Sequence, residues 1–126
     1  MINLTNLILC IAMVEGANPT QKVGECWGKF QIKPIFIEEV NRILRKRYGI
    51  SPNGGFVRND CLNPSESEWM VRYWLEDRVD KHPEWTVYDL ALAYNAGDTG
   101  AKTATKEQKD YAVWVRNLYN LKEDDE

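Results

Sequence analysis

The sequence predicts a mainly α-helical fold. Five segments begin at a helix-capping residue or a proline, or carry apolar residues at helical spacing, and no convincing alternating strand pattern is present. The chain has 126 residues, of which 44% are hydrophobic and 28% charged, which is ordinary for one globular domain and excludes a disordered chain. We therefore expect a single domain over residues 1–121 and an acidic tail over residues 122–126.

The first two helices are expected over residues 3–15 and from Pro34 to Arg47. Proline suits the first turn of a helix, and Gly49 suits the position just past its end. The apolar residues of the first helix recur at positions that share one face. They are Leu4, Leu7, Ile8 and Ile11.

Three more helices are expected over residues 65–81, 86–97 and 105–121, and each opens on a serine or threonine cap. Residues 65–68 and 105–108 have the pattern of a capping box, in which the cap and the third helical residue satisfy each other's backbone N–H groups.

The two longest connections are expected to be irregular. Residues 16–33 hold three of the eight glycines and could contain a short hairpin. Residues 51–64 are rich in glycine, proline and asparagine, which is typical of a long loop.

Charge and histidine content exclude several classes of function. The net charge is −3 and the isoelectric point about 5.3, so no broad basic surface is available for a nucleic acid. His82 is the one histidine and directly precedes Pro83. A Ser/His/Asp or Cys/His nucleophile would need this residue, and nothing near it suggests such a system.

The three cysteines, Cys10, Cys26 and Cys61, lie far apart in the sequence, with no Cys-x-x-Cys or His-Glu-x-x-His pattern. We expect no metal site and no cofactor. Three free thiols in a reducing compartment are the favoured interpretation, and Cys26 with Cys61 is the one pair considered for a disulfide.

The longest apolar run, residues 7–14, is too short to cross a bilayer, which needs about 20 residues. No basic residue precedes it, since the first is Lys22, and no clear cleavage site follows. We therefore expect no membrane anchor and no signal peptide, and synthesis in the cytoplasm.

Glu15 is placed on the apolar face of the first helix, because it follows Ile11 by four residues and Ile8 by seven. Burial of a carboxyl group raises its pKa, so that it can donate a proton near neutral pH. Glu15 is thus a candidate general acid. The alternative is that its side chain turns outward at the helix end, where Gly16 would allow it.

Four further motifs follow Glu15 along the chain. They are Asn18-Pro19, the pattern G-x-x-Q-x-x-P at Gly28, Gln31 and Pro34, the run Ala93-Tyr94-Asn95-Ala96-Gly97, and Glu107 with Tyr111. In this order the chain resembles the soluble lytic transglycosylase domain, a lysozyme-like fold related to goose-type lysozymes. It is most similar to the small phage and secretion-associated members of that family, and the matches cover roughly residues 8–116.

The resemblance implies a peptidoglycan-cleaving enzyme with Glu15 as the catalytic acid and base, no cofactor, and glycan strands as the partner. Six residues are expected to bind the substrate or line its cleft. They are Gln31, Tyr94, Asn95, Trp27, Glu107 and Tyr111. For Trp27, stacking on sugar and a packing role stay open as alternatives.

A small catalytic domain without a signal also fits a phage endolysin released through a membrane hole, or a factor exported by a secretion machine. We expect it to act on the cell wall as a monomer.

Two other functions are considered. A lysozyme-type hydrolase of the same fold would use a second carboxylate to position water, for which Glu25, Asp60 and Asp98 are candidates. A non-catalytic wall-binding protein could use the same groove.

Two more sets of residues are interpreted as structural. Five aromatic residues at helical spacing are expected in the core, namely Trp69, Tyr73, Trp74, Trp114 and Tyr119. Four basic residues are expected on a solvated helix face, with contact to an anionic wall polymer as the alternative. They are Arg42, Arg45, Lys46 and Arg47.

Overall fold

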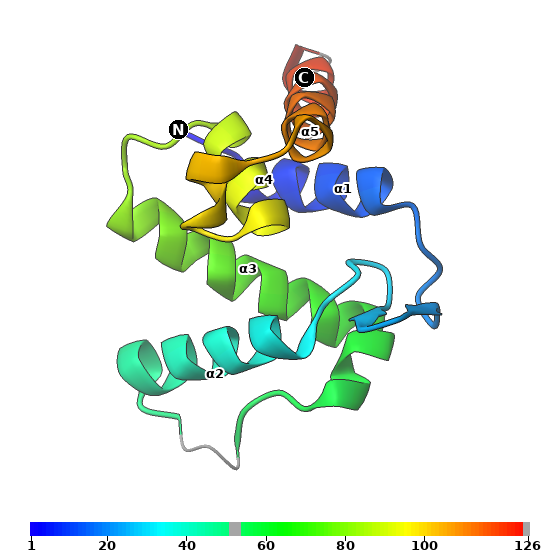
Figure 1. Ribbon diagram of the computed structural model, residues 1–126. Helices are drawn as coiled ribbons and strands as arrows, with labels where there is room; N and C mark the ends of the chain where they lie inside the picture. The colour runs from blue at the N-terminus through cyan, green and yellow to red at the C-terminus, as the bar shows by residue number, and fades with distance from the viewer. Residues whose placement is uncertain (51–53, 125–126) are drawn as a thin grey trace. The chain divides into compact units, whose positions relative to one another are not determined.

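The computed structural model describes residues 1–50 and 54–124, and 69% of these residues are helical (Figure 1). The prediction of a mainly α-helical fold is confirmed. The elements in chain order are α1 (Leu4–Glu15), β1 (Lys22–Val23), β2 (Cys26–Trp27), α2 (Pro34–Tyr48), the 3-10 helix η2 (Arg58–Leu62), α3 (Pro64–Lys81), α4 (Val87–Ala96), the 3-10 helix η3 (Gly100–Thr103) and α5 (Lys106–Asp124).

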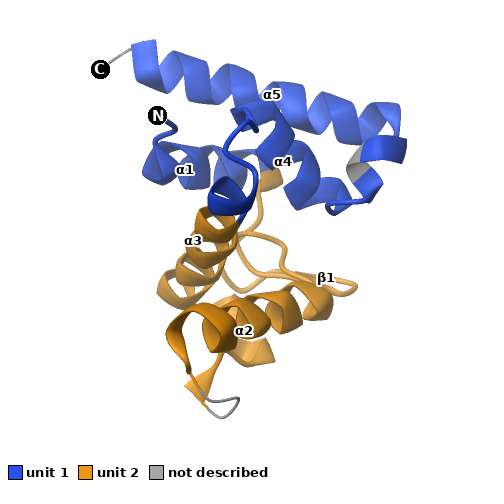
Figure 2. Cartoon of the chain, turned by 90° about the vertical axis from the view of Figure 1, so that its left-hand side faces the viewer, with its two compact units in different colours: residues 1–14, 78–126 blue, residues 15–77 orange. Residues whose placement is uncertain are grey.

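The chain forms two compact units (Figure 2). Residues 1–14 and 78–126 make up the first, which we call the helical unit, and residues 15–77 make up the second, which we call the hairpin unit. That both belong to a single domain stays a prediction.

In the helical unit, α4 packs against α5, and α1 is hydrogen-bonded to the C-terminal end of α5. The Asn3 N–H donates to the Tyr119 hydroxyl over 2.8 Å, and the Asn6 side-chain amide donates to a Glu123 carboxylate oxygen over 2.6 Å. Helix α5 continues three residues past the expected end at Leu121, into part of the expected acidic tail, and the bond from Asn6 stabilises this extension at Glu123. The final two residues of that tail lie outside the described residues.

In the hairpin unit, β1 and β2 form a short antiparallel hairpin, which the sequence analysis gave as a possibility in this segment. Lys22 lies opposite Trp27 in this pair. Helix α2 contacts α3 through the rings of Phe36 and Trp74, whose centroids are 5.7 Å apart. The largest fully buried side chains of the unit are Phe30, Ile32, Ile43, Met70, Leu75, Val40 and Val71.

Two helix starts follow the predicted caps. The Thr86 hydroxyl accepts from the Asp89 N–H, and the Asp89 carboxylate accepts from the Thr86 N–H, which completes a capping box at α4. Thr105 and Gln108 exchange the equivalent pair of bonds at α5.

The predicted capping box at Ser65 is wrong. Helix α3 begins at Pro64, and the side-chain oxygen of Asn63 accepts from the N–H groups of Ser65 and Glu66 at 2.9 and 3.1 Å. Asparagine is as good a cap as serine, and a proline directly after it suits the first turn, so this pair determines the helix start.

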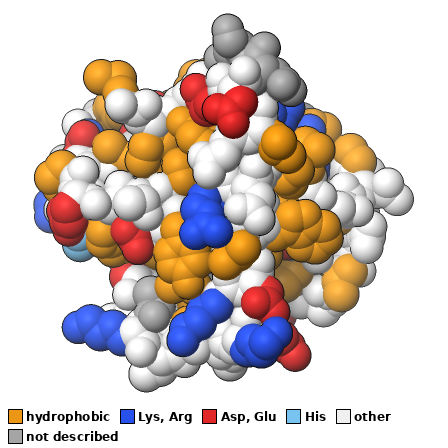
Figure 3. Space-filling model, turned by 90° about the horizontal axis from the view of Figure 1, so that it is seen from above, with side chains coloured by type: hydrophobic (Ala, Val, Ile, Leu, Met, Phe, Trp, Pro, Cys, Tyr) orange, Lys and Arg blue, Asp and Glu red, His pale blue; other side chains and the backbone are white. Residues whose placement is uncertain are grey.

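The aromatic core was predicted only in part. Trp74 and Tyr119 are buried as expected, whereas Trp69 is 50% and Trp114 60% exposed. Trp69 stacks on the half-buried Tyr73 at 5.6 Å, on the outer side of α3. Hydrophobic side chains lie among charged and polar ones on the surface drawn in Figure 3.

Within the described residues, no helix has the length and apolar character needed to cross a membrane.

Candidate active site

Glu15 is the last residue of α1 and is half-buried. The residues one and two turns before it on the same face, Ile11 and Ile8, are buried, as the spacing predicted. Gly16 has a φ of 65°, so the chain turns away directly after the carboxylate. The partial exposure of Glu15 lies between the two alternatives that the sequence left open, a buried side chain and one that turns outward.

Gly28 lies at a position where no side chain fits. It is buried, its φ is 82°, and an added Cβ would collide with the backbone carbonyl oxygen of Cys61. Its N–H donates to the carbonyl of Gln21 over 2.7 Å. The glycine of the G-x-x-Q motif is therefore required both by its φ and by a close approach to η2.

Gln31 closes the turn that Gly28 opens. Its backbone N–H and its side-chain amide both donate to the Gly28 carbonyl, at 3.1 and 2.9 Å. Trp27 and Ile32 on either side exchange two backbone hydrogen bonds of 3.0 and 2.9 Å. Gln31 is half-buried, so the turn presents a fixed amide at its edge.

Gln31 has a backbone φ of 52°. It is the one non-glycine residue with positive φ in the described part of the chain. For a residue with a Cβ this conformation costs about 1–2 kcal/mol, and such strain concentrates at functional sites. The side-chain oxygen of Gln31 accepts no hydrogen bond from the described residues, so it is available to a ligand N–H or O–H group.

Trp27 lies beside two cations. The Lys22 ammonium is 4.1 Å from the centroid of its ring and the Arg58 guanidinium carbon is 3.9 Å from it. The indole N–H donates to the Gly24 carbonyl over 3.3 Å. These contacts favour the packing role for Trp27 over stacking on sugar.

Arg58 is a residue of this region that the sequence analysis missed. Its two terminal nitrogens donate to the backbone carbonyls of Ile32 and Glu25, at 3.0 and 2.6 Å, and so join η2 to the hairpin. Its position in an irregular connection gave no periodic signal that could have identified it.

In the helical unit, Tyr94 and Asn95 occupy the last turn of α4. Tyr94 is half-buried and Asn95 is exposed. The helix ends at Gly97, whose φ is 83° and whose N–H donates to the Ala93 carbonyl over 2.8 Å.

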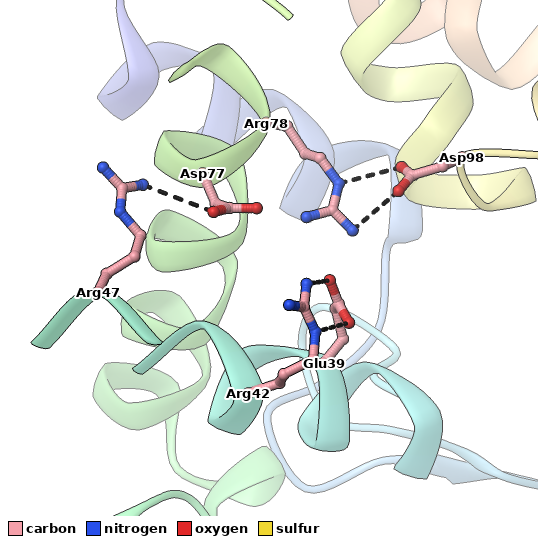
Figure 4. Close-up of polar contacts among 6 residues, drawn as sticks. All are labelled: Glu39, Arg42, Arg47, Asp77, Arg78 and Asp98. Carbon is pink, nitrogen blue, oxygen red and sulfur yellow. Dashed lines mark hydrogen bonds and ion pairs between the residues drawn. The ribbon is translucent and has the colours of Figure 1, made fainter. Parts of the chain in front are cut away.

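An ion pair between a buried arginine and an exposed aspartate holds this end of α4. Arg78, 5% exposed, donates from two guanidinium nitrogens to the two carboxylate oxygens of Asp98, both at 3.0 Å (Figure 4). Asp98 directly follows Gly97, so the pair fixes the backbone beside Tyr94 and Asn95. Arg78 was also missed, because a cation within a helix carries no sign of its partner in the sequence.

Glu107 and Tyr111 lie one turn apart at the start of α5, the helix against which α4 packs. Glu107 is exposed and Tyr111 half-buried. Both therefore belong to the same unit as Tyr94 and Asn95, whereas Glu15, Trp27 and Gln31 belong to the hairpin unit.

Two of the three candidate second carboxylates have structural partners. Asp98 binds Arg78, and Asp60 accepts from the Val57 N–H over 2.8 Å at the start of η2. Glu25 is exposed and forms no ion pair with the described residues.

All three cysteines are free thiols, with Cys10 and Cys61 buried and Cys26 half-buried. Burial raises the pKa of the Cys61 thiol, although the Arg58 charge acts in the opposite direction. Burial also raises the pKa of Cys10. Within the part of the chain that the structure describes, no group of three His, Cys, Asp or Glu residues could hold a metal ion.

Compared with known proteins, the chain matches no family model, no curated protein and no solved structure.

Proposed function

We propose that the protein cleaves peptidoglycan at the β-1,4 bond between N-acetylmuramic acid and N-acetylglucosamine, as a lytic transglycosylase of lysozyme-like fold with Glu15 as its acid and base. The proposal rests on the resemblance of the sequence motifs. The observation that carries it furthest is the turn from Gly28 to Gln31.

That turn has features that stability alone does not require. A glycine or asparagine would adopt the positive φ of Gln31 with less strain, yet a glutamine stands there with its side-chain oxygen available. A strained residue that presents a fixed amide is typical of a ligand-binding position. An amide of this kind suits the hydroxyl and acetamide groups of amino sugars.

In the proposed reaction, the protonated Glu15 carboxyl group gives its proton to the glycosidic oxygen as the bond to the muramyl C1 breaks. The substrate's own acetamide oxygen stabilises the positive charge at C1, so no second protein carboxylate is required. The Glu15 carboxylate then takes the proton of the muramyl 6-hydroxyl, while the oxygen of that hydroxyl forms a bond to C1. The products are a 1,6-anhydromuramic end and a free N-acetylglucosamine 4-hydroxyl.

The remaining candidates take supporting roles. Gln31 of the hairpin unit and Tyr94 and Asn95 of the helical unit are each assigned to sugar binding. Glu107 and Tyr111 are assigned a secondary role in lining the cleft. The engagement of Asp60 and Asp98 in structural bonds favours this mechanism over a hydrolase that needs a second carboxylate. The proposal implies action on the wall, after release through a membrane hole or a secretion machine.

The test is mass spectrometry of purified peptidoglycan after digestion by the parent protein and by Glu15→Gln. Glu25→Gln is the matched control, because it removes a carboxylate that pairs with none of the described residues. We expect 1,6-anhydromuramic ends from the parent and the control, and at least ~100-fold less product from Glu15→Gln.

Other products would change the assignment. Reducing-end muramic acid that disappears with Glu25→Gln would identify a hydrolase. Binding of the wall by both the parent and Glu15→Gln, with no fragments from several wall types, would identify a non-catalytic binding protein.

A further inference from the structure

Two cations beside the Trp27 ring, Lys22 on β1 and Arg58 on η2, form no ion pair with a carboxylate of the described residues. Lys22 and Arg58 each lie about 4 Å from the centroid of the Trp27 ring, so their charges are at most about 8 Å apart. Neither forms an ion pair with any described residue. The bonds of Arg58 go to backbone carbonyls, which leave its charge in place. We call Lys22 and Arg58 the cation pair.

Two basic residues of α2, in the same unit, differ from the cation pair because each lies beside a carboxylate. Arg42 binds Glu39 through two hydrogen bonds of 3.0 and 2.6 Å, and Arg47 lies 3.8 Å from the buried Asp77 (Figure 4). These two charges have carboxylate partners, whereas those of the cation pair have none among residues 1–50 and 54–124. Two like charges at this separation repel each other, and an anion bound beside them would be stabilised by both.

The cation pair adjoins the residue that the proposed function assigns to the sugar. Arg58 donates to the carbonyl of Ile32, which directly follows Gln31, and Lys22 is paired across the hairpin with Trp27. A group attached to a sugar bound at Gln31 would thus lie near the cation pair.

We infer that Lys22 and Arg58 bind a carboxylate of the peptide that peptidoglycan carries on its muramic acid, an inference that rests on the proposed function. Muramic acid bears this peptide on its lactyl group, and the peptide has free carboxylates unless they are amidated. A guanidinium and an ammonium match a carboxylate in charge and in hydrogen-bond donors. The enzyme would then prefer strands with free peptide carboxylates to strands in which these are amides.

The test uses the full chain and a soluble muropeptide, N-acetylglucosaminyl-N-acetylmuramyl tripeptide, which contains no bond of the type that the proposed reaction cleaves. Its twin has every carboxylate converted to an amide. Binding is followed through the indole N–H signal of Trp27 in the NMR spectrum. We expect the free acid to shift this signal and to bind about threefold more tightly than the amide.

Lys22→Gln should bring the ratio of the two affinities close to one. The Lys22 side chain is exposed and forms no hydrogen bond or ion pair with a described residue, so the substitution removes only its contact with the Trp27 ring and should leave the fold in place. Lys46→Gln is the matched control, because the Lys46 side chain is also exposed and forms no ion pair with a described residue, but lies on the last turn of α2. It should leave the ratio unchanged. Arg58→Lys keeps the charge, and should retain part of the preference.

Equal affinities for acid and amide, no change at Trp27, or equal effects of Lys22→Gln and Lys46→Gln would each overturn the inference. Tighter binding of a glycerol phosphate oligomer than of the free acid would overturn it too, in favour of an anionic wall polymer. Turnover of insoluble peptidoglycan is measured separately. An active enzyme without the preference refutes only this inference, and a preference without turnover refutes only the proposed function.

Discussion

Two arginines hold the two segments that carry the candidate sugar-binding residues, and they do so differently. Arg58 donates to backbone carbonyls beside Gln31, whereas Arg78 donates to the Asp98 carboxylate just after the end of α4. In the first case the positive charge stays available to a ligand, and in the second it is neutralised within the protein. The partner of an arginine therefore decides whether it can also act in recognition.

The two segments also differ in how their glycines are used. Both Gly28 and Gly97 have a φ of about 80°. A Cβ at Gly28 would collide with the backbone of Cys61, while one at Gly97 would meet nothing within 4 Å. Gly28 is required by a close approach of two backbones as well as by its φ, whereas Gly97 is required by its backbone conformation alone.

The largest effect is expected from alanine at these two glycines. Gly28→Ala combines a backbone collision with strain, and should lower the free energy of unfolding by more than about 3 kcal/mol or prevent folding. Gly97→Ala brings strain only, and should cost about 1–3 kcal/mol. Urea denaturation of both variants measures the difference. Equal costs would mean that the approach of Gly28 to Cys61 does not constrain the turn.

The second comparison is between two substitutions, one that removes the carboxylate partner of Arg78 and one that weakens the carbonyl bonds of Arg58. Asp98→Ala leaves the buried Arg78 without its carboxylate, and should lower the free energy of unfolding by about 1–3 kcal/mol, because Asp98 itself is partly exposed. Arg58→Lys keeps the charge but loses part of the carbonyl bonding, and should cost about 0.5–1.5 kcal/mol. Thermal and urea unfolding give both values. A larger cost for Arg58→Lys would show that the carbonyl bonds, and not the neutralised pair, contribute more to stability.

Local sequence signals predicted much of the fold, because capping and periodicity act within a few residues. The cap at Thr86 and the end of α1 at Glu15 are of this kind. At α3 the capping-box pattern led to the wrong cap, because it marked Ser65 and the residue that caps the helix is Asn63. Trp114 was predicted in the core from its helical spacing, but it is exposed. The spacing of apolar residues does not reveal the angle at which a helix packs, so it could not show which of them are covered.

The contacts of the candidate site could not be predicted from the sequence, because they join segments that are far apart along the chain. The motif marked Gly28 and Gln31, but the reason for the glycine is the carbonyl of Cys61, and the fixing of the turn depends on Arg58. The function of Asp98 likewise depends on Arg78. Such partners follow from tertiary structure, and no residue spacing encodes them.

The smallest effect on stability is expected from Gln31→Gly. Glycine relieves a strain of about 1–2 kcal/mol at positive φ, but it removes the side-chain bond to Gly28 and gives the unfolded chain more freedom, each worth about 0.5–1 kcal/mol. The free energy of unfolding should therefore change by less than about 1 kcal/mol. Turnover of peptidoglycan should nevertheless fall at least tenfold if the amide binds the sugar, and Gln31→Asn, which keeps an amide on a shorter side chain, should recover part of it. A loss of more than about 2 kcal/mol with unchanged turnover would instead make Gln31 a structural residue of the turn, and the strain at its backbone would need a reason other than ligand binding.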